Sequence, residues 1–299
     1  MLLLTVVYDK FKEDIVEKVS EMKQYFNERN ITVGFSESID NNTHFLKIFC
    51  DENAYDSKLT KIFNFYMADI LYDLVIDEFY KKEIHNFITN TYFFLKYDEI
   101  KEIKNLSLKA LKNKGPITNE NMVFYRNRKN SIIQKITDCI EENKEINING
   151  FIRFRMKEFI NDLESIIDKV VENYMVEKEY SEFIKLLKYF VDLQESKIEK
   201  INIIIEGNEN YILQDGFGND IMDILFSDLS DDKFSGAISI DDMLISALIT
   251  NAPKNIIIHG KENCSNKEIL DTITSVFGDR VKFCDKCNMC KNIKSKIKS

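Results

Sequence analysis

The spacing of apolar residues changes twice along this chain, and the change constrains the fold more than any other feature. Short apolar or alternating runs, which are typical of strands, occur with helical segments in residues 1–53 and again in residues 196–299. In residues 54–195 the apolar residues recur instead at the spacing of amphipathic helices. We therefore predict an α+β protein with a small N-terminal α/β unit, a central helical bundle and a C-terminal α/β unit, divided at these boundaries.

The clearest helical pattern lies toward the end of the central region. Apolar residues there repeat at alternating steps of four and three, at Met156, Ile160, Leu163, Ile167, Val170 and Tyr174. Phe159 and Ile166 widen this stripe beyond the narrow seam of a coiled coil, which indicates a helix buried on a broad face of a bundle. The alternative is a two-stranded coiled coil, which would make the protein a homodimer.

The C-terminal region ends in a β-α-β pattern. A strand-like run at residues 255–260 is followed by a helical pattern at 266–278 and by a second strand at 280–283. Two strands joined through a helix are usually parallel, with a right-handed crossover. Because parallel strands point the same way, we expect the residues that follow them to meet at one edge of the sheet.

Composition and charge restrict the classes of function. Hydrophobic residues make up 44% of the chain and charged residues 30%, which is the balance of a soluble globular protein. The net charge of −9 disfavours a general nucleic-acid binder, because such a protein needs a basic surface. The sequence has no run of about eighteen apolar residues and no basic segment before its first apolar run, so we expect a cytoplasmic protein without a membrane span. Thiols stay reduced in the cytoplasm, so the six cysteines are not expected to form a disulfide framework.

The sequence lacks the common signatures of enzyme active sites. Its only Gly-x-Gly, at Gly216 and Gly218, has Ile221 where a dinucleotide-binding loop needs a third glycine. It has no phosphate-binding loop, no Gly-x-Ser-x-Gly turn and no His-Glu-x-x-His motif. The sequence therefore favours a protein that is not an enzyme.

Three cysteines close to the end of the chain form the strongest candidate site. Cys284, Cys287 and Cys290 are each separated by two residues, a spacing that lets consecutive sulfurs converge on one ion. Three thiolates and a fourth ligand can hold a structural zinc ion or a [4Fe–4S] cluster. Cys264 precedes the helix of the β-α-β pattern, and parallel strands would bring it to the same edge as these cysteines, so it is our candidate for the fourth ligand. His259 is the second choice.

Two other interpretations of the three cysteines stay open. A Cys-x-x-Cys pair also serves in thiol exchange or forms a reversible disulfide. The three thiols can equally be without any ligand. No proline follows Cys290, so the run that is typical of a ferredoxin is incomplete.

Arginine is scarce and clustered. Four of the six arginines lie between positions 126 and 155, namely Arg126, Arg128, Arg153 and Arg155. The planar guanidinium suits bidentate contacts, so we predict that Arg153 and Arg155 hold carboxylates of the protein itself or of a partner. The alternative is a nucleic-acid-binding module that combines this cluster with the basic tail at residues 291–299.

Residues 151–198, 244–260 and 277–290 resemble the YtxC family of sporulation proteins from spore-forming Firmicutes. The Cys-x-x-Cys near the end of the chain is similar to part of the family pattern. The resemblance implies a cytoplasmic protein linked to sporulation, and it implies no particular biochemical activity. Our leading interpretation is a non-enzymatic protein that acts through contacts with an unknown protein partner, with the cysteines as a structural or sensing site. The alternative from another class is a redox enzyme that depends on a metal or an iron–sulfur cluster.

Overall fold

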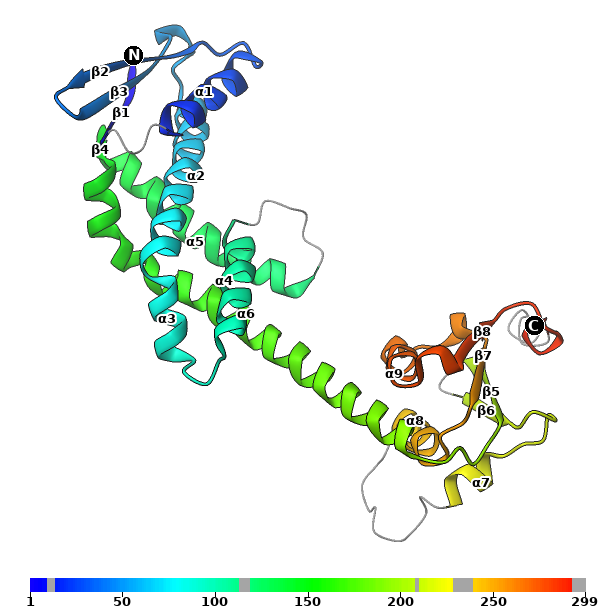
Figure 1. Cartoon of the computed structure of the whole chain (residues 1–299). Coiled ribbons are helices and arrows are strands. Elements are labelled where there is room, and N and C mark those ends of the chain that lie inside the picture. The colour runs from blue at the N-terminus through cyan, green and yellow to red at the C-terminus, as the bar shows by residue number, and fades with distance from the viewer. Residues whose placement is uncertain (10–13, 113–118, 208–209, 228–238, 292–299) are drawn as a thin grey trace. The chain divides into compact units, whose positions relative to one another are not determined.

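The computed structural model of the chain confirms the α+β class (Figure 1). It has two compact units, unit 1 at Met1–Met175 and unit 2 at Val176–Ser299. This division differs from the three predicted regions, because the N-terminal sheet and the central helices share one hydrophobic core. The residues that the structure describes are 1–9, 14–112, 119–207, 210–227 and 239–291.

Unit 1 contains a mixed four-stranded sheet with the strand order β2-β3-β1-β4. The first three strands pair antiparallel, and they are β1 (Leu2–Asp9), β2 (Val33–Asp40) and β3 (Thr43–Cys50). Between β1 and β2, α1 (Asp14–Asn27) buries Ile15, Val19, Met22 and Phe26 in the core. The fourth strand, β4 (Glu145–Asn147), pairs parallel to β1 and comes from the region that the sequence predicted to be helical. This long-range pairing ties the sheet to the helices.

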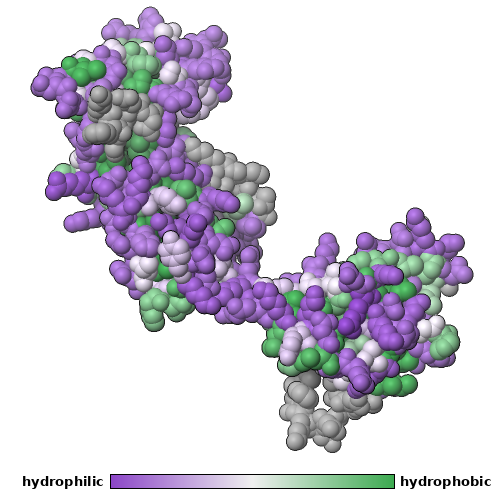
Figure 2. Space-filling view, viewed as in Figure 1, coloured by the Kyte–Doolittle hydropathy of each residue, from purple (hydrophilic) through white to green (hydrophobic). Residues whose placement is uncertain are grey.

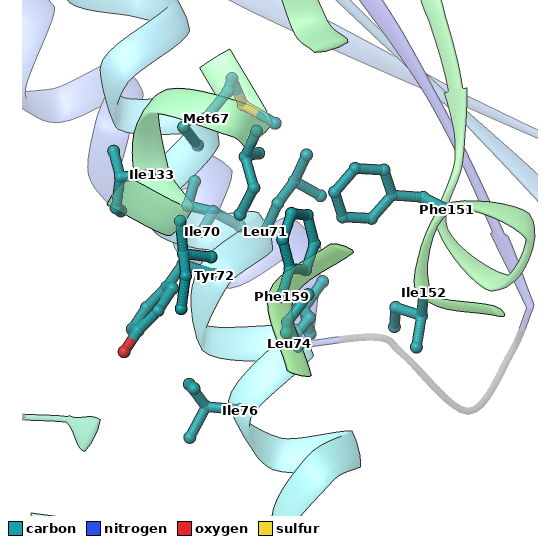
Figure 3. Close-up of a cluster of buried hydrophobic side chains, with 14 of the residues drawn as sticks. Met67, Ile70, Leu71, Tyr72, Leu74, Ile76, Ile133, Phe151, Ile152 and Phe159 are labelled. Atoms are coloured by element: carbon teal, nitrogen blue, oxygen red, sulfur yellow. The ribbon is translucent and has the colours of Figure 1, made fainter. Parts of the chain in front are cut away.

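The helices after the sheet are η2 (Glu52–Ala54), α2 (Ser57–Lys82), α3 (Ile84–Thr91), α4 (Tyr97–Leu111), α5 (Glu120–Glu142) and α6 (Ile148–Leu193), of which η2 is a 3-10 helix. Asp56 and Asn119 cap the N-termini of α2 and α5, since each side chain accepts a hydrogen bond from a backbone N–H of the first turn. Figure 3 shows how the core is filled, with Leu71 of α2 close to Phe151 and Phe159 of α6. The rings of Phe151 and Phe159 lie 6.0 Å apart between centroids.

The helix predicted from the four-and-three spacing is part of α6, and it is buried on a broad face as expected. Leu163, Ile166 and Ile167 are fully buried in the core of unit 1. The stripe at residues 156–174 is thus covered by the chain itself. Beyond Met175, α6 continues into unit 2.

Unit 2 is built on a second mixed sheet with the strand order β6-β5-β7-β8 (Figure 1). Its strands are β5 (Lys200–Gly207), β6 (Asn210–Gln214), β7 (Asn255–His259) and β8 (Val281–Cys284). β6 runs antiparallel to β5, whereas β5, β7 and β8 are parallel to one another. The other elements are α7 (Met222–Ser227), α8 (Ile240–Asn251), α9 (Lys267–Phe277) and the 3-10 helices η3 (Lys261–Asn263) and η4 (Gly278–Arg280). The predicted β-α-β unit with parallel strands is therefore confirmed as β7-α9-β8.

The two faces of this second sheet differ in what they bury. Successive strand residues point to opposite faces, and Ile201, Ile203 and Ile258 belong to the face that forms a core with α8 and α9. The alternate residues Asn202 and His259 point to the other face. Both are buried, although both are polar.

No helix within the described part of the chain is long and apolar enough to cross a membrane. Figure 2 shows hydrophilic residues over most of the visible surface of unit 1 and larger apolar areas on unit 2.

Candidate metal centre

The site begins with two residues that end neighbouring parallel strands. His259 is the last residue of β7 and Cys284 the last residue of β8, and the two are register partners. The carboxyl ends of parallel strands lie at the same edge of a sheet, which is where α/β proteins commonly place their sites. The β-α-β topology therefore brings together two ligand types that are 25 positions apart in the sequence.

The chain after β8 turns back and brings two more sulfurs to this edge. Residues 288–291 form a single helical turn, in which Lys291 N donates to Cys287 O at 3.1 Å. The thiol of Cys290 donates to the backbone carbonyl of Cys284 at 3.1 Å. The backbone N–H groups of Lys286 and Cys287 donate to the sulfur of Cys284. This tight turn converges all three sulfurs, as the two-residue spacing predicted.

The four donor atoms have the separations of ligands around one ion. His259 Nδ1 lies 3.3 Å from Cys287 Sγ and 3.4 Å from Cys290 Sγ, and these two sulfurs are 3.6 Å apart. All four donor atoms, including Cys284 Sγ, lie within 4.8 Å of one another. A tetrahedral zinc ion with Zn–S of about 2.3 Å and Zn–N of about 2.0 Å needs donor atoms roughly 3.5 to 3.8 Å apart. The group therefore fits a single ion after small adjustments.

Burial and hydrogen bonds set the charge state of each donor. Burial, followed by the nearby charge of Lys200, lowers the pKa of His259, so its imidazole is neutral and has a free lone pair at neutral pH. Burial, with contributions from the two neighbouring thiols, raises the pKa of Cys290 to about 12. The two backbone N–H groups that reach Cys284 lower the pKa of its thiol. Cys284 is thus suited to be a thiolate, whereas Cys290 needs a cation beside it to lose its proton.

Cys264 lies outside this group, and His259 occupies the fourth position instead. The thiol of Cys264 donates to the backbone carbonyl of Asn266 at 3.0 Å, and burial raises its pKa. Cys264 belongs to the core on the helix-covered face of the sheet. His259 follows Ile258 in the strand alternation and so points to the opposite face. The β-α-β topology brings both residues near one edge of the sheet. His259 lies on the same face as its register partner Cys284, whereas Cys264 belongs to the opposite face.

Arg128 and Arg155, two of the four clustered arginines, pair with carboxylates of the protein itself. Arg155 donates to Glu158 at 2.7 Å, and Arg128 donates to Asp162 at 3.2 Å, each through one contact rather than a bidentate pair. Within the described ranges Arg153 makes no ion pair, and its guanidinium lies 6.0 Å from the ring centroid of Phe154. The basic tail lies outside the described residues from position 292 onward.

The sequence did not predict the contact between His259 and Asn202, which lies on the side of the imidazole away from the sulfurs. His259 Nε2 lies 3.5 Å from Oδ1 of Asn202 in β5. The available signal was a single polar residue inside the apolar run of residues 201–205. A buried amide in such a strand must bond to something, and here it faces the imidazole.

Comparisons with known proteins identify a family and a relative. The family model of the YtxC-like family matches residues 65–282, which include His259 and end just before Cys284. A relative, "Uncharacterized protein YtxC" of Bacillus subtilis (strain 168), is 25% identical over 223 residues, which cover 72% of this chain and 75% of the relative. No solved structure matches the chain. The family model covers most of the chain, and the chain therefore belongs to the YtxC-like family.

Proposed function

We propose that His259, Cys284, Cys287 and Cys290 hold one structural zinc ion in a non-enzymatic protein that acts through contacts with a protein partner. The observation that carries the proposal is the convergence of one imidazole nitrogen and three sulfurs within 4.8 Å. The assignment to the cytoplasm and to sporulation rests on the family resemblance and belongs to the same proposal.

Zinc is the metal that this donor set favours. Three cysteines and one histidine are a ligand set of structural zinc sites, in which four protein ligands complete the tetrahedron. Such a closed site leaves no position for a substrate, which agrees with the absence of enzyme signatures in the sequence. Cysteines on a [4Fe–4S] cluster each ligate a different iron, so their sulfurs stand much farther apart than the 3.6 Å between Cys287 and Cys290.

A structural ion would stabilise a part of unit 2 that packing alone holds weakly. β8 is an edge strand of four residues, and none of its side chains is fully buried. The turn at residues 288–291 follows it and buries Cys290. An ion bound to His259 of β7 would tie both segments to the sheet, and the binding energy would add to the stability of the fold.

The proposed protein contacts are supported by an exposed apolar row on α6. Phe183, Leu186, Phe190 and Leu193 are 53%, 50%, 45% and 64% exposed. Their spacing of three, four and three places them on one side of the helix. The neighbouring side of the same helix packs against the core of unit 2 through Ile184, Leu187 and Val191. Soluble proteins rarely expose a contiguous apolar row of this kind unless it contacts something.

The test of the metal site is metal analysis on protein purified without oxygen and under reducing conditions. We expect a colourless protein with one zinc per chain. Cys287→Ser should lose the zinc, whereas the matched control Cys264→Ser, which changes a buried cysteine of the same unit outside the group, should keep it. Iron with inorganic sulfide would support the cluster enzyme instead. Protein without metal whose three thiols are freely alkylated in the native state would refute the site.

A further inference from the structure

Asn202 is a buried polar residue that contacts the histidine of the candidate metal centre. It lies in β5, is 5% exposed, and is flanked by the buried residues Ile201 and Ile203. An amide buried in an apolar strand without hydrogen bonds would destabilise the fold, because it gives up its contacts with water and gains none in return. Its two polar atoms are therefore expected to have partners, and each one does.

The amide of Asn202 is held in one orientation. Its Nδ2 donates to the backbone carbonyl of Asp215 at 2.9 Å, so its Oδ1 points the other way and lies 3.5 Å from His259 Nε2. The donor contact uses the NH₂ group, and only an oxygen then faces the ring. Oδ1 of Asn202 can accept a hydrogen bond from the imidazole N–H and cannot donate one.

The carbonyl that orients Asn202 is itself fixed by a tight turn. The carboxylate of Asp215 accepts from the backbone N–H groups of Phe217 and Asn219 at 2.8 and 2.9 Å and from Asn219 Nδ2 at 2.8 Å. Gly218 allows this turn, since its φ of 94° lies in the region that favours glycine. The turn thus holds the Asp215 carbonyl, which holds the amide of Asn202.

A neutral imidazole carries one N–H, and the acceptor beside Nε2 determines where that hydrogen lies. With the N–H on Nε2, the lone pair is on Nδ1, the atom that faces the sulfurs of Cys287 and Cys290. Ligating histidines commonly donate their other N–H to an oxygen that fixes the tautomer and the ring orientation. We infer that Asn202 is a positioning residue of the metal centre, which makes His259 bind the ion through Nδ1. This inference rests on the proposed zinc site.

The chain offers a matched control on the same face of the sheet. Gln214 of β6 is the register partner of Asn202, so its side chain points to the same side. Gln214 has no hydrogen bond to His259 within the described residues, and its Oε1 is buried without a partner there. A change at Gln214 therefore perturbs the same face of the sheet without touching the imidazole.

The first test measures the zinc affinity of the full chain by competition with a chromophoric chelator. Asn202→Leu removes the acceptor at similar volume and should weaken zinc binding by about 10- to 100-fold. Asn202→Asp keeps an oxygen beside Nε2 but loses the donor to the Asp215 carbonyl, so it should weaken zinc binding less than Asn202→Leu does. Gln214→Leu should bind zinc like the parent. Asn202→Leu with parental affinity would overturn the inference and leave the zinc site standing, whereas a parent that binds no zinc would overturn both.

The second test reads the tautomer directly, first in the parent protein and then in the two leucine variants. Long-range proton–nitrogen NMR spectra of the zinc-loaded, ¹⁵N-histidine-labelled protein report which nitrogen of His259 carries the hydrogen. We expect a protonated Nε2 and zinc on Nδ1, and a loss of protection of the Nε2 hydrogen in Asn202→Leu but not in Gln214→Leu. Zinc on Nε2 of the parent would contradict the proposed role of Asn202.

Discussion

His259 and Cys284 are direct register partners at the carboxyl ends of the parallel strands β7 and β8. Because α9 joins these strands, the pair closes a β-α-β unit at one edge of the sheet. The turn after Cys284 then returns Cys287 and Cys290 to the same edge. An ion at this point would connect three segments, of which the last two have little packing of their own.

Removal of the metal should loosen unit 2 locally. We expect a chelator to increase hydrogen exchange in β7, β8 and the turn at 288–291, because the proposed ion links them. Cys287→Ser should have the same effect, while Cys264→Ser should not. The helices α2 to α5 belong to unit 1 and have a separate core, so their exchange should stay unchanged. Uniform loosening of both units, or no change in either, would count against a local structural ion.

The ionic contacts of the Asp162 carboxylate should stabilise the packing of α5 against α6 more than the exposed ion pairs do. It is 7% exposed and accepts from Lys135 at 2.7 Å, from Arg128 at 3.2 Å and from Ser131 at 3.2 Å. Asp162→Asn removes the charge that these donors face and should lower the free energy of unfolding by about 1 to 3 kcal/mol. Chemical denaturation measures the difference.

The control for Asp162 lies one turn earlier on the same helix. Glu158 pairs with Arg155 at 2.7 Å, but both side chains are well exposed. Glu158→Gln should therefore cost less than about 0.5 kcal/mol. Equal losses in the free energy of unfolding in Asp162→Asn and Glu158→Gln would show that burial does not determine how strongly these contacts stabilise the fold.

The sheet of unit 1 should lose stability in acid as Glu37 becomes protonated. The hydroxyl of Tyr8 and Nδ1 of His44 both lie 2.6 Å from Oε1 of Glu37, and these two hydrogen bonds, Tyr8 first, lower the pKa of the carboxyl group. A lowered folded-state pKa contributes stability that is present above the unfolded-state pKa, about 4.3, and is lost as the pH falls through the folded-state value. The difference in free energy of unfolding between the parent and Glu37→Gln should therefore shrink as the pH falls below about 4. A difference that is independent of pH would contradict this account.

The exposed row on α6 should be dispensable for folding. Leu186→Lys changes a residue that is 50% exposed and should alter the free energy of unfolding by no more than about 0.5 kcal/mol. Leu187→Lys changes the neighbouring residue on the packed side and should cost about 1 to 3 kcal/mol. Denaturation compares the two, and sedimentation of the parent and of Leu186→Lys tests whether the row joins two copies of the chain. Equal destabilisation by both variants would show that the row is part of the core.

The sequence predicted the helices and strands whose apolar pattern is formed by neighbouring residues. The four-and-three spacing around Leu163 identified the buried stretch of α6, and the apolar runs around Ile257 and Lys282 identified the parallel strands β7 and β8. It did not predict β4, because three residues with only Ile146 buried carry no strand pattern, and their pairing with β1 is set by tertiary packing.

The candidate ligands show which part of the site the sequence could predict and which part it could not. Spacing alone placed Cys284, Cys287 and Cys290 together, since the turn that converges them is local. Choosing between His259 and Cys264 required knowing which face of the sheet each side chain reaches, and this depends on strand register and on the helices that cover the other face.

X-ray absorption at the zinc edge on the full chain tests the central claim most directly, because it identifies the atoms around the ion. We expect three sulfurs at about 2.3 Å and one nitrogen at about 2.0 to 2.1 Å, supplied by Cys284, Cys287, Cys290 and His259. The outer-shell scattering of the imidazole ring should disappear in His259→Ala and remain in Cys264→Ser. Four sulfurs in the parent, or a shell of oxygen and nitrogen alone, would contradict the site described here.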